Sequence, residues 1–388
     1  MEQKTEIPRW LWALAGFGGL GLLVLGLASV SVTFALPEAF GAAGVIVAGF
    51  GLIAATLGIS LGVAGLRGWR NAPSMRFYSR WTWAVLLLGS IVTAISGSLM
   101  PVQLQGHALF APFHFLMITL PGLLLLSVVT LLIGRESALS IRRTVLALAS
   151  GASGVVLAIP VEVIGLMLSG MLSVAVAMVF PGGSAEVDRL LTLVQGWTVR
   201  PPTSEAEILG VVTSPVVLLA LTLTLSVVTP LVEELSKTLL LGLFGMWVKP
   251  IAPVAFLWGA ACGLGFAWLE GVSNGAVGLG GVGGWLGSVG VRLFATAMHV
   301  LTSGLLGLGW GWFWRGRRWA LPITYGVAVI FHGLWNLNVI VSVGGLGLAA
   351  SSPATGGMLV TLGVVVQLAL VLLATTALIV IPLALRKA

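Results

Sequence analysis

Two adjacent carboxylates and a lysine lie in the middle of an otherwise apolar stretch of the chain. The segment Pro230–Thr238 reads Pro-Leu-Val-Glu-Glu-Leu-Ser-Lys-Thr, and the apolar run around it covers residues 209–248. A charged side chain at the centre of a bilayer costs roughly 2.5 kcal/mol or more, so Glu233, Glu234 and Lys237 need partners, water or a chemical task. Because Lys237 follows Glu233 by four residues, we expect the lysine to pair with Glu233 and to keep it ionised, while Glu234 takes another partner.

Few other ionisable side chains occur in the apolar runs after residue 209. They are Glu270, Arg292, His299 and His332. Asn274 follows Glu270 by four residues and therefore shares its helix face. Asn336 stands at the same spacing from His332. Carboxylates, imidazoles and carboxamides together can supply a general base, donors to an oxyanion and metal ligands, which indicates hydrolysis inside the membrane.

The composition of the chain is that of a membrane protein. Of its 388 residues, 58% are hydrophobic and 8% are charged, and the mean hydropathy is +1.10. A soluble domain could not expose this much apolar surface to water. The basic residues lie in short connections between apolar runs, where they act as topology signals, so a nucleic-acid partner is not expected. We therefore predict an all-α, multi-pass helical bundle in the lipid bilayer of the cell membrane.

Apolar runs of spanning length predict about ten transmembrane helices. They cover residues 10–36, 40–66, 81–99, 109–133, 144–180, 209–248, 254–275, 290–313, 319–343 and 357–385. Residues 144–180 and 209–248 are too long for one simple span, and Pro160 and Pro230 are their natural breaks, so twelve spans are the alternative. The polar connection at 181–208 is expected to be a solvated link outside the membrane.

The distribution of basic residues predicts the orientation. Three connections are rich in arginine, which stands at positions 67, 70, 76, 80, 135, 142, 143, 315, 317 and 318. If these connections are cytoplasmic, both termini are cytoplasmic as well, and only Arg189 and Arg200 remain outside. In this orientation the ionisable residues of four helices fall roughly 7 to 17 Å below the outer face at 1.5 Å per residue. We therefore expect their side chains to converge in one layer.

Four motifs follow one another on successive apolar runs. They are Glu233-Glu234-Leu235-Ser236-Lys237, Gly263-Leu264-Gly265-Phe266 running to Glu270, Arg292 ahead of His299, and His332 followed by Asn336. In this order they resemble the PrsW family of intramembrane proteases, which is related to the CAAX-processing and bacteriocin-immunity (Abi) membrane proteases. The resemblance covers roughly residues 225–340. One departure is Gly271, where the family is expected to have asparagine.

The resemblance implies a protease that cuts membrane-anchored proteins, in some relatives an anti-sigma factor. The predicted catalytic residues are Glu233, Glu234, Glu270, His299, His332 and Asn336, with Lys237 and Arg292 in support. In one mechanism Glu233 activates a water molecule, and Glu234 or Glu270 passes the proton to the leaving amine. The two histidines and Asn336 would then stabilise the oxyanion.

A metal centre is the other mechanism that the sequence leaves open. Glu270, His299 and His332 would ligate zinc, because two histidines and a glutamate are a known catalytic ligand set. No His-Glu-x-x-His motif is present in the chain. The sequence therefore does not separate a zinc protease from a metal-free one.

A proton-coupled transporter is the alternative function for an embedded cluster of glutamates and histidines. A transporter would more often have an internal repeat, and here the charged cluster lies in the second half of the chain. We therefore favour the protease. We expect N-terminal transmembrane helices over residues 1–208 outside the resemblance, a protease core over 209–343, and a C-terminal transmembrane helix over 344–388.

Overall fold

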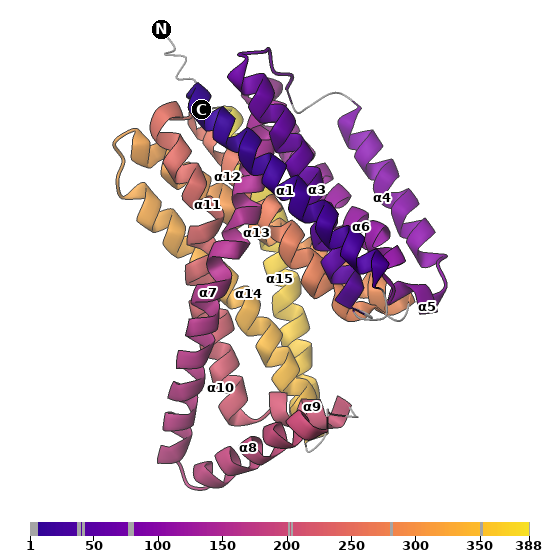
Figure 1. Ribbon diagram of the computed structural model, residues 1–388. Coiled ribbons are helices and arrows are strands. Elements are labelled where there is room, and N and C mark those ends of the chain that lie inside the picture. The colour runs from indigo at the N-terminus through magenta and orange to yellow at the C-terminus, as the bar shows by residue number, and fades with distance from the viewer. Residues whose placement is uncertain are drawn as a thin grey trace. The chain divides into compact units, whose positions relative to one another are not determined.

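The computed structural model describes residues 7–36, 40, 43–76, 81–200, 202, 205–279, 282–349 and 352–387. Every named element in these ranges is a helix, and the fold is all-α, as predicted (Figure 1). Two properties of the sequence and of lipid explain the helices. The apolar runs are longer than strands, and in lipid a helix satisfies its own backbone hydrogen bonds.

Nine helices of the described chain are long and apolar enough to cross a membrane. They are α1 (Arg9–Ala35), α3 (Ala43–Trp69), α6 (Ala111–Ile133, extended at its start by a short 3₁₀ turn from Ala108), α7 (Ile141–Val179), the continuous helix of α10 (Pro215–Leu223) and α11 (Thr229–Val248), α12 (Ala252–Gly275), α13 (Val282–Trp314), α14 (Ala320–Ala349) and α15 (Pro353–Arg386). A shorter apolar helix, α4 (Thr82–Ser98), occupies the third predicted run. The chain is therefore a multi-pass membrane protein.

Neither long run forms two spans. The first is one helix of 39 residues, α7, which continues through Pro160. The second run begins with the short helix α9 (Glu205–Val212) and continues, after a break at Ser214, as the helix from Pro215 to Val248. The twelve-span alternative is therefore wrong for the described chain, which has nine helices of spanning length and the shorter α4 in the third predicted run.

The described chain divides into two compact units. The first contains residues 1–156, 234–328 and 374–388, and the second contains residues 157–233 and 329–373. The boundary falls inside α11, between Glu233 and Glu234, so one helix carries polar residues into both units.

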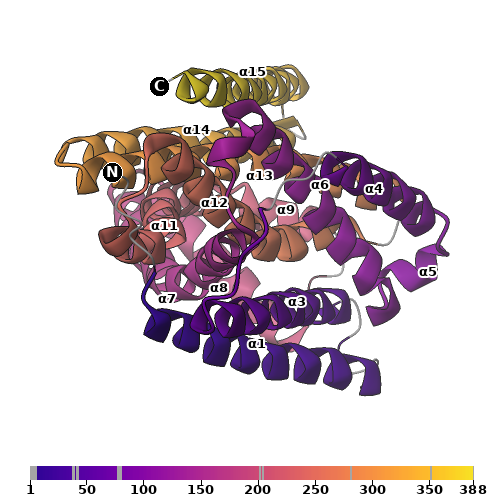
Figure 2. The ribbon, with the colours of Figure 1, turned by 90° about the horizontal axis from the view of Figure 1, so that it is seen from above.

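In the first unit α1 and α3 lie side by side (Figures 1 and 2). Their contact follows a seven-residue spacing, because α1 buries Trp12, Gly19, Gly26 and Thr33. A Cβ added at Gly19 or Gly26 would meet the backbone of α3, so only glycine allows this approach. Small residues let membrane helices pack closely where the hydrophobic effect does not drive them together.

Helix α12 is the most buried helix of the first unit and packs against α13 (Figure 2). A Cβ at Gly259 would meet the carbonyl of Ser303, and a Cβ at Gly263 would meet the carbonyl of His299. The two glycines therefore bring the α12 backbone into contact with α13. The start of α7 approaches from another side, where Gly151 lies against the backbone of Cys262.

The second unit contains a helix where the sequence predicted a polar link. Residues 183–199 form α8 (Gly183–Val199), which Figure 1 shows running crosswise at the end of α7. Leu190 of α8 packs with Val211 and Val216 in a small apolar core, so part of the 181–208 connection is a packed helix, while most of its residues are exposed or half-buried. In the same unit Asn338 of α14 donates to Gly363 O (2.7 Å) and Gln367 Oε1 (2.8 Å) of α15.

Candidate active site

A break in helical hydrogen bonding precedes the two glutamates. Residues 224–228 form a π-helical turn, in which Thr229 N–H donates to Thr224 O. In this pattern the carbonyl of Leu225 would accept from residue 230, but Pro230 has no N–H. Asn336 of α14 supplies the missing donor, with Nδ2 2.7 Å from Leu225 O. The π turn is therefore held open by proline on one helix and by asparagine on another.

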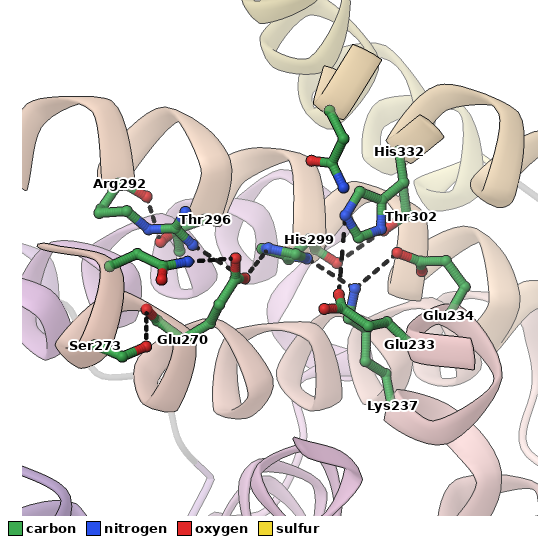
Figure 3. Close-up of polar contacts among 12 residues, drawn as sticks. Glu233, Glu234, Lys237, Glu270, Ser273, Arg292, Thr296, His299, Thr302 and His332 are labelled. Atoms are coloured by element: carbon green, nitrogen blue, oxygen red, sulfur yellow. Dashed lines mark hydrogen bonds and ion pairs between the residues drawn. The ribbon is translucent and has the colours of Figure 1, made fainter. Parts of the chain in front are cut away.

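Glu233 and His332 approach each other in the second unit. His332 Nε2 lies 3.8 Å from Glu233 Oε2, and the two side chains are 3% and 8% exposed (Figure 3). This distance is beyond a hydrogen bond. Two potential ligand atoms thus face each other at the end of the π turn, one from α11 and one from α14.

Glu234 and Lys237 form a fully buried ion pair in the first unit. Lys237 Nζ is 2.7 Å from Glu234 Oε1, and neither side chain has any exposed area. Lys237 Nζ is also 2.8 Å from His299 Nδ1 (Figure 3). It lies 4.4 Å from the centre of the Phe266 ring. The lysine therefore joins the helix of the glutamates to α12 and α13.

Glu270 links the other side of His299 to an arginine. Its Oε2 lies 2.6 Å from His299 Nε2 and 3.0 Å from an Arg292 Nη2, and its Oε1 accepts from Asn274 Nδ2 at 3.0 Å. Glu270 is 24% exposed and Arg292 13%, whereas His299 is 1% exposed. His299 is thus the buried centre of this group.

The contacts of the first unit form a charge-balanced chain. Two carboxylates, Glu234 and Glu270, are matched by two cations, Lys237 and Arg292, with the His299 imidazole between them. A protonated Lys237 donates to Nδ1 of His299, which leaves the proton of that ring on Nε2, facing Glu270. Balanced pairing is what allows several charges to be buried in an apolar bundle.

The structure corrects the expected ion pair of Lys237. Lys237 makes its ion pair with Glu234, three residues away, and not the pair with Glu233 that the four-residue spacing suggested. Glu233 and Glu234 stand four and three residues before Lys237, so either could reach it along the helix, and the neighbouring helices decide which one pairs with the lysine. Glu270 binds His299 and Arg292 in the first unit, while Glu233 is the carboxylate beside His332.

Phe266 is a site residue that the sequence reasoning did not single out. Its ring contacts the ammonium of Lys237 and lies 5.7 Å from the ring of His299. The signal was its place in the Gly263–Phe266 motif, one helical turn before Glu270, which puts it on the same face of α12. The two glycines of that motif serve packing, since a Cβ at Gly265 would meet the carbonyl of Leu148.

In the second unit, Glu233 and His332 could hold a metal ion. Both are buried, and each can offer one ligand atom. A carboxylate and an imidazole are ligands that zinc and related ions accept. The separation of Glu233 Oε2 from His332 Nε2, 3.8 Å, is close to the spacing of about 3.3 Å expected for two atoms on one tetrahedral zinc with bonds of roughly 2.0–2.1 Å. The donor set therefore fits a metal centre.

A polytopic helical bundle that buries carboxylates and imidazoles on four consecutive spanning helices has the side chains that a membrane-embedded hydrolase uses. The model of the PrsW family of intramembrane metalloproteases matches residues 144–374, which is more than half of the chain. The chain belongs to this family and is an integral membrane protease. Searches of curated proteins and of solved structures gave no match.

Proposed function

We propose that the protein hydrolyses peptide bonds of membrane-anchored proteins at a metal centre whose ligands include Glu233 and His332. The observation that carries this assignment is the buried approach of Glu233 to His332 at 3.8 Å, in a family of metalloproteases. In some relatives the substrate is expected to be an anti-sigma factor, so such a factor is a candidate substrate here.

A bound zinc ion would supply Lewis-acid activation of the attacking water and of the scissile carbonyl. Glu270 orients His299, because it accepts the Nε2 proton, and Nδ1 then accepts from Lys237. A carboxylate behind a histidine raises the basicity of the imidazole and fixes its ring. Arg292 in turn holds the Glu270 carboxylate at 3.0 Å.

Glu234 and Lys237 are the proton-handling pair in this proposal. As the water oxygen bonds to the carbonyl carbon, the Glu234 carboxylate accepts the water proton, and it returns that proton to the amine nitrogen when the C–N bond breaks. The Lys237 ammonium stabilises the negative charge that develops on the carbonyl oxygen. Their full burial strengthens both effects, since charges act more strongly where water is excluded.

A second candidate keeps the same residues without a metal. Both ring nitrogens of His299 have protein partners within 2.8 Å, namely Lys237 and Glu270. This favours a mechanism in which Glu233 activates the water directly and His332 donates to the oxyanion.

Metal content and cleavage measured together test both candidates. The purified full chain is compared with Glu233→Gln and His332→Ala, using a single-pass substrate and elemental analysis. Glu186→Gln is the matched control, because Glu186 is a carboxylate of α8 paired with Arg189 outside the cluster. We expect close to one zinc per chain in the wild type and the control, and loss of zinc with an activity loss of about 100-fold or more in both variants.

Cleavage that persists in strong chelators, with no metal in the active protein, would reject the metal centre in favour of the second candidate. Full activity of Glu233→Gln would reject both.

A further inference from the structure

A basic cavity lies at the ends of α1, α3 and α7 in the first unit. It has a volume of about 450 Å³, and its lining includes Arg76, Arg142, Arg143, Asn71, Ser74 and Ser140. None of the described residues that line it is acidic. Three guanidinium groups with hydroxyls and an amide form a recognition set for an anionic phosphate group.

Two connections far apart in the sequence build this cavity. Ile141 N donates to Met75 O at 2.8 Å, and Arg76 and Ser140 form an antiparallel bridge. The Arg142 guanidinium stacks over the Trp12 ring of α1 at 5.5 Å from its centre. With its amide turned so that the oxygen faces Arg9, the Asn71 side chain accepts from Arg9 Nη2 at 2.6 Å. The arginines are thus held in place by backbone pairing and by an aromatic ring.

An apolar groove of about 430 Å³ adjoins the cavity. Trp12 lines both, and the groove runs on along α1 and α3 past Gly16, Phe17 and Gly62 as far as Leu20. From Trp12 to Leu20 it follows the helix for about 12 Å, close to one leaflet of a hydrocarbon core that is roughly 30 Å thick. Phe17 and Leu20 are 74% and 58% exposed, as expected of a lipid-facing surface.

We propose that the cavity and the groove together bind one anionic phospholipid. The headgroup phosphate lies against Arg76, Arg142 and Arg143, and an acyl chain lies in the groove between α1 and α3. The cavity sits at helix ends, where headgroups are found, and the groove enters the depth of the acyl chains. Charge selects an anionic headgroup, and the attached groove selects a lipid over free phosphate. Basic pockets between membrane helices bind anionic lipids in this way.

Lipid retention by the purified full chain tests the headgroup. Native mass spectrometry compares the binding of phosphatidylglycerol with that of phosphatidylcholine. The double variant Arg142→Gln/Arg143→Gln is compared with the control Arg317→Gln, which changes an exposed arginine of another connection. We expect the wild type and Arg317→Gln to bind phosphatidylglycerol at least tenfold more tightly than phosphatidylcholine, and the double variant to lose this preference. If the double variant does not fold, Arg76→Gln, at an exposed position, should weaken binding at least threefold.

Substitution of glycines in and beside the groove tests whether an acyl chain lies there. A Cβ at Gly62 meets no atom within 4 Å, and the same is true of Gly18, which lies outside the groove. Gly62→Leu should fill the groove and weaken phosphatidylglycerol binding at least threefold, whereas Gly18→Leu should leave it unchanged.

Three outcomes would overturn the proposal. They are equal retention by the double variant and Arg317→Gln, no effect of Gly62→Leu, and displacement of the lipid by equimolar inorganic phosphate, which would mark a plain phosphate site. Binding is measured without proteolysis, so the result is independent of the proposed mechanism.

Discussion

His299 Nε2 lies 2.6 Å from Glu270 Oε2, while the other nitrogen of the same ring lies 2.8 Å from Lys237 Nζ. This buried imidazole therefore joins a carboxylate on α12 to an ammonium on α11. The arrangement fixes the ring and its proton, which is the usual task of a carboxylate behind a catalytic or metal-bound histidine. The residues around His299 can be tested one by one.

Replacing Glu270 by glutamine should reduce kcat about 10- to 100-fold, because the amide no longer holds the Nε2 proton of His299 as a carboxylate does. KM should change little, since Glu270 acts through His299. Steady-state kinetics and zinc content measure the effect. Asn274→Ala is the control, because Asn274 contacts only the outer oxygen of Glu270 in the described contacts. Equal losses in the two variants would contradict a specific positioning role.

Removing one partner of the buried pair should destabilise the protein more than removing both. Lys237→Met leaves the Glu234 carboxylate buried beside an apolar side chain, which costs about 3–5 kcal/mol. The double variant Glu234→Met/Lys237→Met should recover part of that loss, because apolar side chains replace both charges. Unfolding in detergent measures the free energies. A double variant less stable than both single variants would contradict this account.

Gly263→Ala should disturb the site without changing an ionisable group. The added Cβ would meet the carbonyl of His299, so α13 would have to move, at a cost of about 1–3 kcal/mol and with loss of cleavage. Gly287→Ala on α13 is the control, because a Cβ there meets no atom within 4 Å. Thermal unfolding and cleavage assays compare the two. Unchanged activity in Gly263→Ala would show that the close approach of α12 and α13 is not required.

The contribution of Asn336 should depend on Pro230. Asn336→Ala removes the donor to Leu225 O and should cost about 1 kcal/mol in the wild type. Pro230→Ala restores a backbone N–H at that point, so the same substitution should cost less in the Pro230→Ala background. A double-mutant cycle on unfolding free energies measures the difference. Additive effects would show that the two residues do not serve the same carbonyl.

Labelling of single cysteines should confirm the predicted orientation. In a Cys262→Ala background, Arg317→Cys should react with a membrane-impermeant thiol reagent only from the cytoplasmic side. Val199→Cys, at a position that is 89% exposed, should react only from the outside. The opposite pattern would invert the topology and place the basic cavity outside.

The sequence alone was sufficient for the fold class and for most of the helices. Apolar runs predicted each long helix to within several residues, because the length of a membrane helix is fixed by the bilayer and its composition by the lipid. It was also sufficient for choosing the buried polar residues, since charge in an apolar run is costly and therefore conspicuous. Glu233, His299 and His332, all buried, were chosen in this way, although the predicted zinc ligands included Glu270 and not Glu233.

The tertiary structure decided which of these residues meet. Glu233 and Glu234 both lie within one turn of Lys237. Glu234 forms the ion pair with the lysine because of the side chains of α12 and α13 around the lysine. The donor from Asn336 to Leu225 O joins α14 to the π turn before α11, and the arginine cavity joins two connections distant in sequence. Periodicity and hydropathy describe one helix at a time, whereas such contacts arise from packing between helices, and this is why only the folded chain determines them.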